Sequence, residues 1–265
     1  MMRITLSKIH APVLLTLLTL AVIAQPPASA QSGRQPKEEK KSEKQAQVQP
    51  APLLKRTTTR RELKRLGYGG SVTIDGAPEG SVTVEAWQRS EVEVTAEVEQ
   101  SADTEENLTR LAALNTFAVD EDVNHVRVMT VGLHDRKYAK RAAKGLPKHL
   151  LSMPWRIDYH VKVPAACDLV INAGRGALVV TGVEGALRIN AGGGPDSLFA
   201  LAGGDVDAEV LRAGRIDNAY AGLAPRERTA PTERSLQARA GNGGATLSFT
   251  VGDGTLRIRQ VGGRQ

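Results

Sequence analysis

A short motif that recurs in the second half of the chain constrains the fold most strongly. The sequence INAG at residues 171–174 returns as INAG at residues 189–192, an offset of 18. Short apolar runs and glycine-containing turns lie between the two copies, so the unit reads as strand, turn, strand, turn. A unit of this size cannot bury an apolar face alone and becomes stable only when neighbouring units cover one another. The repeat therefore predicts a β-solenoid, in which short strands stack coil upon coil.

Period-two alternation of apolar and polar side chains predicts further strands before the repeat. This pattern places alternate side chains on one buried face. It occurs at residues 70–74, 81–85, 91–98 and 125–131, and weaker copies of the repeat follow at 204–206, 240–247 and 252–258. Aromatic residues make up only 3% of the chain and there are 26 glycines, which suits stacked short strands with tight turns. We therefore expect an all-β, single-domain solenoid with Gly-rich turns.

Two segments are expected to interrupt the strands. Near residues 104–115, acidic residues precede Leu108, Leu111 and Leu114, a spacing that predicts a short helix with one apolar stripe. Residues 134–149 form a basic excursion with six Lys or Arg against one Asp, which can be helical until Gly145 and Pro147 stop it.

Several of these segments, in this order, also occur in a known family. They are GSVTV at 80–84, the helix near 104–115, the strand at 160–164 leading into 168–171, and the run at 174–185. Over roughly residues 67–262 the chain resembles the "putative adhesin" or toastrack domain family of exported bacterial envelope proteins. The resemblance implies a β-solenoid outside the cytoplasm with a structural, adhesive or envelope-stress role, and the family has no agreed catalytic residues. The basic excursion and the uneven repeats after Gly194 depart from it.

The N-terminus has the features of a secretory signal peptide. Arg3 and Lys8 precede an apolar run at 12–24, and Ala-Ser-Ala at 28–30 offers a cleavage site. The run is shorter than the roughly 20 residues that cross a bilayer, so no transmembrane span is expected after cleavage. We expect a signal peptide at 1–30, a disordered basic linker at 31–66 and the adhesin-like domain at 67–265. Within the linker, residues 57–66 can form a short helix.

The net charge of +6 is unevenly distributed along the chain. Residues 31–66 carry 11 Lys or Arg against 4 Glu, whereas residues 67–265 carry a net charge of −3. The predicted domain is therefore nearly neutral, and nucleic acid is not an expected partner. The expected partners are an unknown envelope protein or an anionic surface polymer, with periplasm, cell surface and medium left open.

The leading functional hypothesis is a non-enzymatic, exported structural or protein-interaction module. The alternative is a salt-dependent binding module for an anionic cell-surface polymer, through the basic segments 31–66 and 134–149. The candidate polymer-binding residues are Arg136, Lys137, Lys140 and Arg141.

No catalytic, cofactor-binding or metal-ligating residues are assigned. A third hypothesis, a hydrolase like the β-helical pectin-degrading enzymes, requires carboxylates gathered on one face. The local candidates are Asp196, Asp205, Asp207 and Glu209. Residues 191–199 match one copy of a calcium-binding β-roll motif, but that site is built from consecutive copies. The single cysteine, Cys167, is expected to be a buried small hydrophobe.

Overall fold

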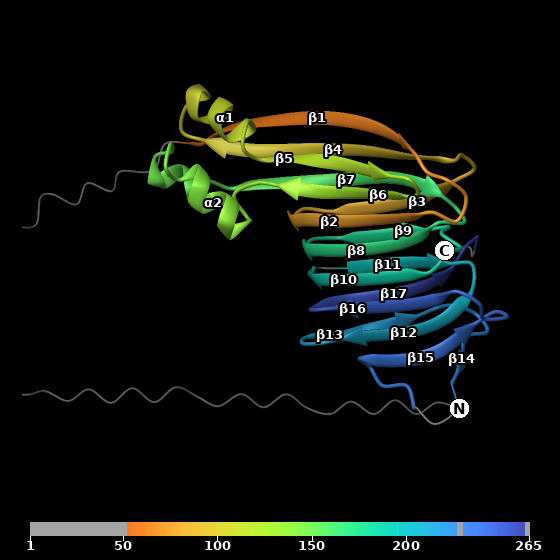
Figure 1. The fold of residues 1–265 in the computed structure, drawn as a ribbon. Helices are drawn as coiled ribbons and strands as arrows, with labels where there is room; N and C mark the ends of the chain where they lie inside the picture. Colours follow the sequence, from red (N-terminus) through yellow and green to blue (C-terminus); the bar gives the residue numbers. More distant parts are fainter. Residues whose placement is uncertain (1–51, 195, 227–229, 263–265) are drawn as a thin grey trace, which may run out of the picture. The chain divides into compact units, whose positions relative to one another are not determined.

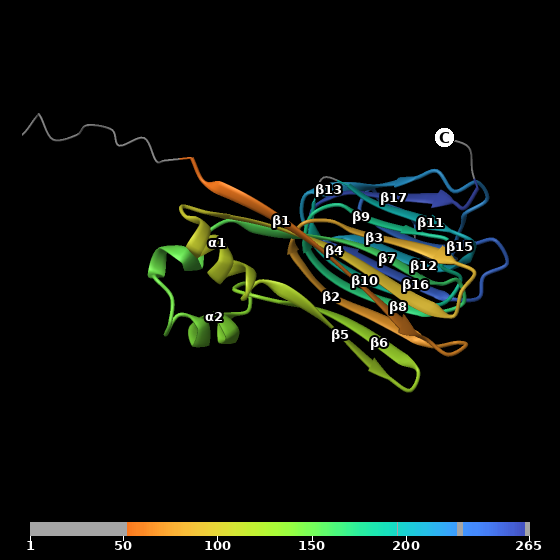
Figure 2. The same ribbon diagram turned by 90° about the horizontal axis from the view of Figure 1, so that it is seen from above.

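The computed structural model describes residues 52–265 except 195, 227–229 and 263–265. In this part of the chain, two β-sheets face one another and enclose the apolar core (Figures 1 and 2). The expectation of an all-β fold built from stacked strands is confirmed. The predicted signal peptide, and the predicted linker as far as residue 51, lie outside the described residues.

The two sheets differ in strand order and share no strand. Within the described residues the first sheet runs in the order β1 (Leu54–Arg65), β4 (Glu91–Ala102), β7 (Trp155–Pro164), β3 (Val82–Trp87), β9 (Leu178–Thr181), β11 (Asp196–Leu201), β17 (Gly254–Gln260) and β13 (Gly214–Asn218). The second runs in the order β14 (Ala224–Pro225), β15 (Ser235–Ala240), β12 (Gly204–Val210), β16 (Thr246–Val251), β10 (Leu187–Gly193), β8 (Asp168–Arg175), β2 (Ser71–Glu79), β6 (His125–Val131) and β5 (Thr116–Asp122).

The middle of each sheet is parallel and is made of rungs, each with one strand in either sheet. The rungs do not stack in chain order. The β2/β3 rung lies between strands β6 and β7 on one side and the β8/β9 rung on the other. Likewise, the C-terminal β16/β17 rung lies between the β10/β11 and β12/β13 rungs. The stack therefore departs from a solenoid that is wound in chain order.

Glycines at the rung corners allow the backbones to approach closely. Three rungs turn from the second sheet to the first through Gly-x-Gly, at 174–176, 192–194 and 252–254. A Cβ on Gly176, which has φ of 152°, would lie 1.6 Å from the carbonyl oxygen of Gly80 in the next rung. A Cβ on Gly194 would lie 2.2 Å from the carbonyl oxygen of Gly176. Only glycine fits such positions, so the spacing of the rungs fixes the residue type at the corners.

The two INAG motifs lie side by side in the second sheet. Strands β8 and β10 pair in parallel, and Ile171 is in register with Ile189. Both side chains are fully buried in the core between the sheets. Burial of an aliphatic side chain of this size contributes about 1.5–3 kcal/mol. Farther along the stack, Phe199 and Phe249 reach across the core from opposite sheets and stack with ring centroids 4.4 Å apart.

Antiparallel strands close one end of both sheets and the other end of the second sheet, whereas the first sheet ends there in β13, which pairs in parallel with β17. Strands β1 and β4 end the first sheet, β5 ends the second sheet beside them, and β15 with β14 closes the other end of the second sheet (Figure 1). The linker prediction is wrong for residues 54–65, which form β1 and pair along their whole length with β4. Neither disorder nor a helix describes this segment. The folded domain therefore begins near residue 54, not at 67.

Both predicted interruptions contain helix. Helix α1 (Glu105–Ala112) is capped by Thr104, whose side chain accepts a hydrogen bond from the backbone amide of Asn107. The basic excursion contains α2 (Arg136–Ala142), capped by Asp135, and a 3₁₀ turn, η1 (Lys148–Ser152). A small second core joins α1 to this excursion, built from Ala102, Leu108, Leu111 and Leu150, with Leu133, Leu146 and Met153 packed against it. No helix of the described residues is long and apolar enough to cross a membrane.

Candidate functional site

The four residues that the sequence singled out lie on one short helix at the surface. Arg136, Lys137, Lys140 and Arg141 all belong to α2, and all four are exposed. Exposed Lys144 and Lys148 follow on the segment that leads through η1. We call these six residues the α2 patch. Among the residues that the structure describes, none of the six forms an ion pair.

The local acid does not neutralise the α2 patch by direct contact. Asp135 is held at the helix N-terminus, where its carboxylate accepts hydrogen bonds from the amides of Tyr138 and Lys137 at 2.9 and 2.6 Å. These bonds, the one from Tyr138 most, keep the pKa of Asp135 below its usual 3.8. Arg136 and Lys140, and likewise Lys137 and Arg141, are four residues apart, where like charges destabilise a helix by about 0.2–0.5 kcal/mol per pair. The patch thus carries a repulsion that Asp135 relieves only in part, through its electrostatic interaction with Lys137.

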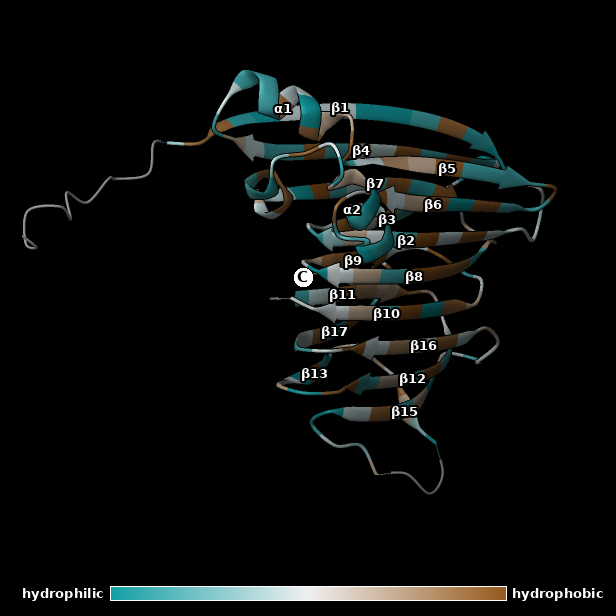
Figure 3. Ribbon diagram, turned by 60° about the vertical axis from the view of Figure 1, so that its left-hand side comes forward, coloured by the Kyte–Doolittle hydropathy of each residue, from teal (hydrophilic) through white to brown (hydrophobic). Residues whose placement is uncertain are grey.

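The helix that carries the patch is held from its two ends. None of the residues of α2 is buried. The chain before it is fixed at Leu133, whose amide donates to Asn115 Oδ1 at 3.0 Å, and the chain after it is fixed by buried Leu150. Both leucines pack in the second core. In Figure 3 the helix stands in front of β6 and β2 and is coloured mostly hydrophilic. Its cations therefore face solvent on a support that is anchored elsewhere.

The basic residues of β1 are in a different electrostatic situation. The strand is coloured mostly hydrophilic in Figure 3 and runs beside the glutamate-rich β4. Five of its cations form ion pairs with carboxylates: Lys55–Glu99, Arg56–Glu105, Arg60–Glu62, Arg61–Glu93 and Lys64–Glu121. The pairing with Arg61 keeps the pKa of Glu93 below its usual 4.5. Within segment 31–66, the part that the structure describes thus has most of its charge compensated.

A ladder of polar side chains crosses the outer face of the second sheet. Asn190 Nδ2 donates to Asn172 Oδ1 at 3.0 Å, and Asn172 Nδ2 donates to Asp75 Oδ1 at 2.7 Å. Arg127 completes the ladder with two bonds to Asp75 Oδ2, at 2.6 and 2.8 Å. Its members come from β10, β8, β2 and β6. The ladder was not predicted from the sequence, although the asparagine of each INAG motif was its visible signal.

A hollow of about 440 Å³ lies where the ladder approaches α2. Asp75, Arg127 and Asn172 line it together with His134, which precedes the helix. Burial lowers the pKa of His134 below its usual 6.5, which outweighs the opposite effect of Asp135. The neutral imidazole is therefore favoured. The hollow joins the ladder to the base of the α2 patch.

The four carboxylates of the hydrolase hypothesis do not all gather on one face, although three of them share the outward face of one strand. Asp196 lies on β11 in the first sheet, whereas the other three candidates, Asp205, Asp207 and Glu209, lie on β12 in the second. Ion pairs also occupy two of the four, because Asp196 contacts Arg257 and Asp205 contacts Arg239 and Arg226. The hydrogen bond from Arg239 keeps the pKa of Asp205 below 3.8, which is unsuited to a general acid.

The structure also locates two other features named from the sequence, the calcium-binding match at residues 191–199 and the single cysteine. Residues 191–199, which match one calcium-binding copy, form the corner between β10 and β11 on either side of residue 195. The prediction for Cys167 is confirmed, since its side chain is buried in the core. Burial raises the pKa of the Cys167 thiol to about 12, and nearby Asp168 adds to the shift.

No protein-family model matches the sequence, and no curated protein matches it. The fold is similar to that of a solved "putative cell adhesion protein" from Clostridium sporogenes, with a TM-score of 0.41 and 10% identity over 77% of this chain and 100% of that chain. A "putative adhesin" from Parabacteroides merdae has a TM-score of 0.24 and 12% identity over 62% and 65% of the two chains. Another from Bacteroides fragilis has a TM-score of 0.22 and 8% identity over 77% and 97%. The likeness is distant in sequence and in fold.

Proposed function

We propose that the protein is an exported, non-enzymatic, adhesin-like module that binds an anionic surface polymer through the α2 patch. The observation that carries the proposal is the absence of ion pairs at this patch within the described residues. The cations of β1, in contrast, are mostly paired. Export is supported by the signal-like features of residues 1–30. The adhesin-like part is in line with the family resemblance of the sequence.

The charge of the patch has a physical cost that a polyanion would relieve. Six cations within residues 136–148 repel one another, and they gain from a partner that brings several negative charges at once. Each basic residue near an anionic surface contributes about 1 kcal/mol, so a contact that uses four of them is strong at low salt. Such binding weakens steeply when salt shortens the screening length to about 8 Å or less.

The test compares two variants of equal net charge. The α2 variant carries Gln in place of Arg136, Lys137, Lys140 and Arg141. The β1 variant carries Gln in place of Lys55, Arg56, Arg60 and Arg61. Binding of the full chain to immobilised polygalacturonate is measured at low and high salt, with uncharged dextran as the control polymer. We expect the first variant to lose nearly all binding and the second to retain at least half.

Equal losses in the two variants would show a non-specific charge effect and would contradict the assignment to α2. Unfolding curves accompany both variants, because the β1 substitutions remove ion pairs. If the β1 variant does not fold, the exposed pair Lys55→Gln and Arg56→Gln is compared with Lys137→Gln and Lys140→Gln. Exposed pairs contribute at most about 1 kcal/mol each, so the smaller variants are expected to fold.

A second candidate function rests on the polar ladder. Rows of side chains on parallel strands repeat at about 4.8 Å, which suits an extended partner that makes the same contact on successive strands. An envelope protein bound there should be cross-linked to the full chain even at high salt. Asn172→Ala together with Asn190→Ala should abolish this cross-link, and Thr83→Ala on the outer face of the first sheet should not. Equal capture by both variants would remove the ladder as a contact site.

A further inference from the structure

A pocket of about 380 Å³ opens at the end of the strands opposite α2. It lies where the chain enters β2, where β3 turns into β4, and where β7 turns into β8. Helix α2, in contrast, follows the other end of β6 and precedes β7. Neither the α2 patch nor the polar ladder shares a residue with this pocket. It is therefore a separate feature of the fold.

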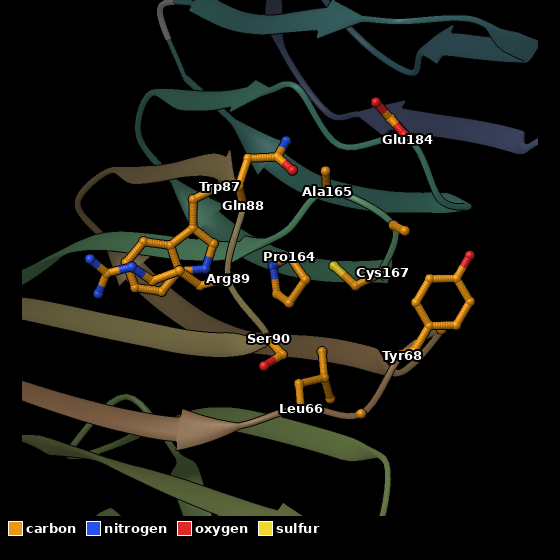
Figure 4. Close-up of a pocket in the computed structure, with 13 residues that line it drawn as sticks. Leu66, Tyr68, Trp87, Gln88, Arg89, Ser90, Pro164, Ala165, Cys167 and Glu184 are labelled. Carbon is orange, nitrogen blue, oxygen red and sulfur yellow. The ribbon is translucent and has the colours of Figure 1, made fainter.

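The walls of the pocket are aromatic and its floor is apolar. Figure 4 shows Trp87 and Tyr68 on opposite sides of Pro164 and Cys167. Trp87 is fixed by a hydrogen bond from its Nε1 to the backbone oxygen of Glu91 at 2.8 Å. Tyr68 is 95% exposed, on a turn next to Gly69, whose φ is 65°. The chain has only nine aromatic residues, so two of them at one pocket are a notable share.

Hydrogen-bonding groups surround this apolar floor on several sides. In Figure 4, Gln88 and Glu184 lie above Pro164 and Ser90 lies below it, whereas the Tyr68 hydroxyl points away from the floor. Arg89 covers the Trp87 ring, with its guanidinium carbon 5.0 Å from the ring centroid. In the described part of the chain, Glu184 and Arg89 form no ion pair. Lys162 also approaches the Trp87 ring, at 5.8 Å, but it is paired with Glu93. The lining residues themselves carry one acid and one base, which gives no strong preference for either charge.

We propose that this pocket binds a neutral saccharide unit. A sugar ring has an apolar face that stacks on aromatic side chains, and it carries hydroxyl groups around its whole perimeter. The pocket offers the same distribution, an apolar floor between two aromatic walls with donors and acceptors around the rim. The site takes a ligand of a different charge class from the polyanion of the α2 patch, and it does not depend on that patch.

A peptide side chain fits this arrangement less well. An apolar side chain carries no hydrogen-bonding groups, and a polar one carries them only at its end, so most of the rim would lose its contacts with water without replacement. Unpaired polar groups of this kind cost binding energy. A ring that carries hydroxyls on all sides replaces those contacts. The pattern of polar groups, more than the apolar floor, therefore distinguishes the ligand class.

The test uses the fact that the chain has only two tryptophans. Trp155→Phe leaves Trp87 as the only tryptophan, and its emission is followed as glucose, galactose or N-acetylglucosamine is added to millimolar concentrations. Cyclohexanol, a ring with a single hydroxyl, serves as the comparison ligand. Saturation-transfer NMR on the same sugars gives a readout that does not depend on fluorescence. We expect at least one sugar to bind saturably and more tightly than cyclohexanol.

Removal of the exposed aromatic wall then tests the position of the site. Tyr68→Ala should weaken sugar binding about fivefold, the size expected for one aromatic contact. Tyr138→Ala on α2 is the matched control and should leave the affinity unchanged. The proposal is overturned if no sugar binds by either readout, if cyclohexanol binds as well as the sugars, or if both tyrosine variants behave alike.

Discussion

Asn172 and Asn190 occupy the same position in two sequence repeats and are hydrogen-bonded to each other, with Asn190 Nδ2 donating to Asn172 Oδ1 at 3.0 Å. Their strands, β8 and β10, are neighbours in parallel register. The repeat of 18 residues is therefore the length of one rung, including both corners. A side chain that points outward in one rung has its counterpart directly beside it in the next. This relationship produces the polar ladder and the aligned Gly-x-Gly corners.

The corners should be the positions most sensitive to a small substitution. Gly176→Ala places a methyl group against the Gly80 carbonyl at a φ that non-glycine residues rarely adopt. We expect a loss of about 2–4 kcal/mol in the free energy of unfolding, measured with urea. Gly145→Ala is the matched control, because a Cβ added there would have no neighbouring atom within 4 Å. It should change stability by less than about 1 kcal/mol. Similar losses for both variants would contradict the close approach of the rungs.

The insertion of the C-terminal rung can be tested by cross-linking. Ser248 on β16 is in register with Arg188 on β10 and with Asp207 on β12. Cysteine pairs at 188 and 248, or at 207 and 248, lie on adjacent strands and should form disulfides on mild oxidation, as detected by mass spectrometry. A pair at 188 and 207 is separated by two strand spacings, about 9.6 Å, and should not. A disulfide between 188 and 207 would show that β10 and β12 are neighbours and that β16 lies elsewhere.

Asp158 should make stability depend on pH in the acid range. Burial alone would raise its pKa, but hydrogen bonds from Arg156, at 2.8 and 2.9 Å, and from the Ser81 amide and hydroxyl, each at 2.7 Å, hold it below 3.8. The folded state thus favours the carboxylate. Its contribution is complete above the unfolded pKa near 3.8 and is lost as the pH falls through the lower folded value.

We therefore expect the wild-type protein to lose more stability between pH 5 and pH 3 than Asp158→Asn does, by urea unfolding at each pH. Asp207→Asn, at an exposed carboxylate without a hydrogen bond or ion pair in the described part of the chain, is the control. It should follow the wild-type profile. A profile of Asp158→Asn that equals the wild type would show that these bonds do not favour the charged form.

The thiol of Cys167 should not react with thiol reagents until the domain unfolds. Its thiol is buried and its pKa is raised to about 12, so almost no thiolate is present at pH 8. A thiol reagent such as DTNB should react with the native protein only at the rate of unfolding and should react at once in urea. Rapid reaction of the native protein would show that the floor of the pocket in Figure 4 is open at Cys167.

The sequence was informative for many of the strands that bury one face. Alternation and the INAG repeat identified β2, β3, β4, β6, β8 and β10, but not β5, β11, β13 or β15, and helix signals located α1. The order of the rungs could not be read, because β8, β10 and β16 place aliphatic or aromatic residues at the same spacing. Leu187, for example, is in register with both Leu169 and Leu247. Any of these strands would satisfy the pattern as a neighbour of any other.

Strand β1 was missed for a related reason. It has no buried residue, so it has no alternation, and its charges resemble those of a linker. Charged edge strands of this kind are usual, because they discourage pairing with other chains. The sequence did contain a signal for the partner of β1, because β4 carries the complementary acidic residues Glu91, Glu93, Glu97 and Glu99. The pockets were not predictable, because each gathers residues from segments that are far apart in the chain.

The measurement that tests the functional account most directly is the salt dependence of binding to polygalacturonate, for the full chain and for the variant with Gln at 136, 137, 140 and 141. For flexible polyanions, the slope of log affinity against log salt is roughly 0.7 per charge neutralised on single-stranded nucleic acid, and less on a more weakly charged polymer. We predict a steep slope for the wild type that falls by at least about 2 in the variant. Equal slopes for the two proteins, or binding by the wild type that does not depend on salt, would contradict a polyanion site at α2.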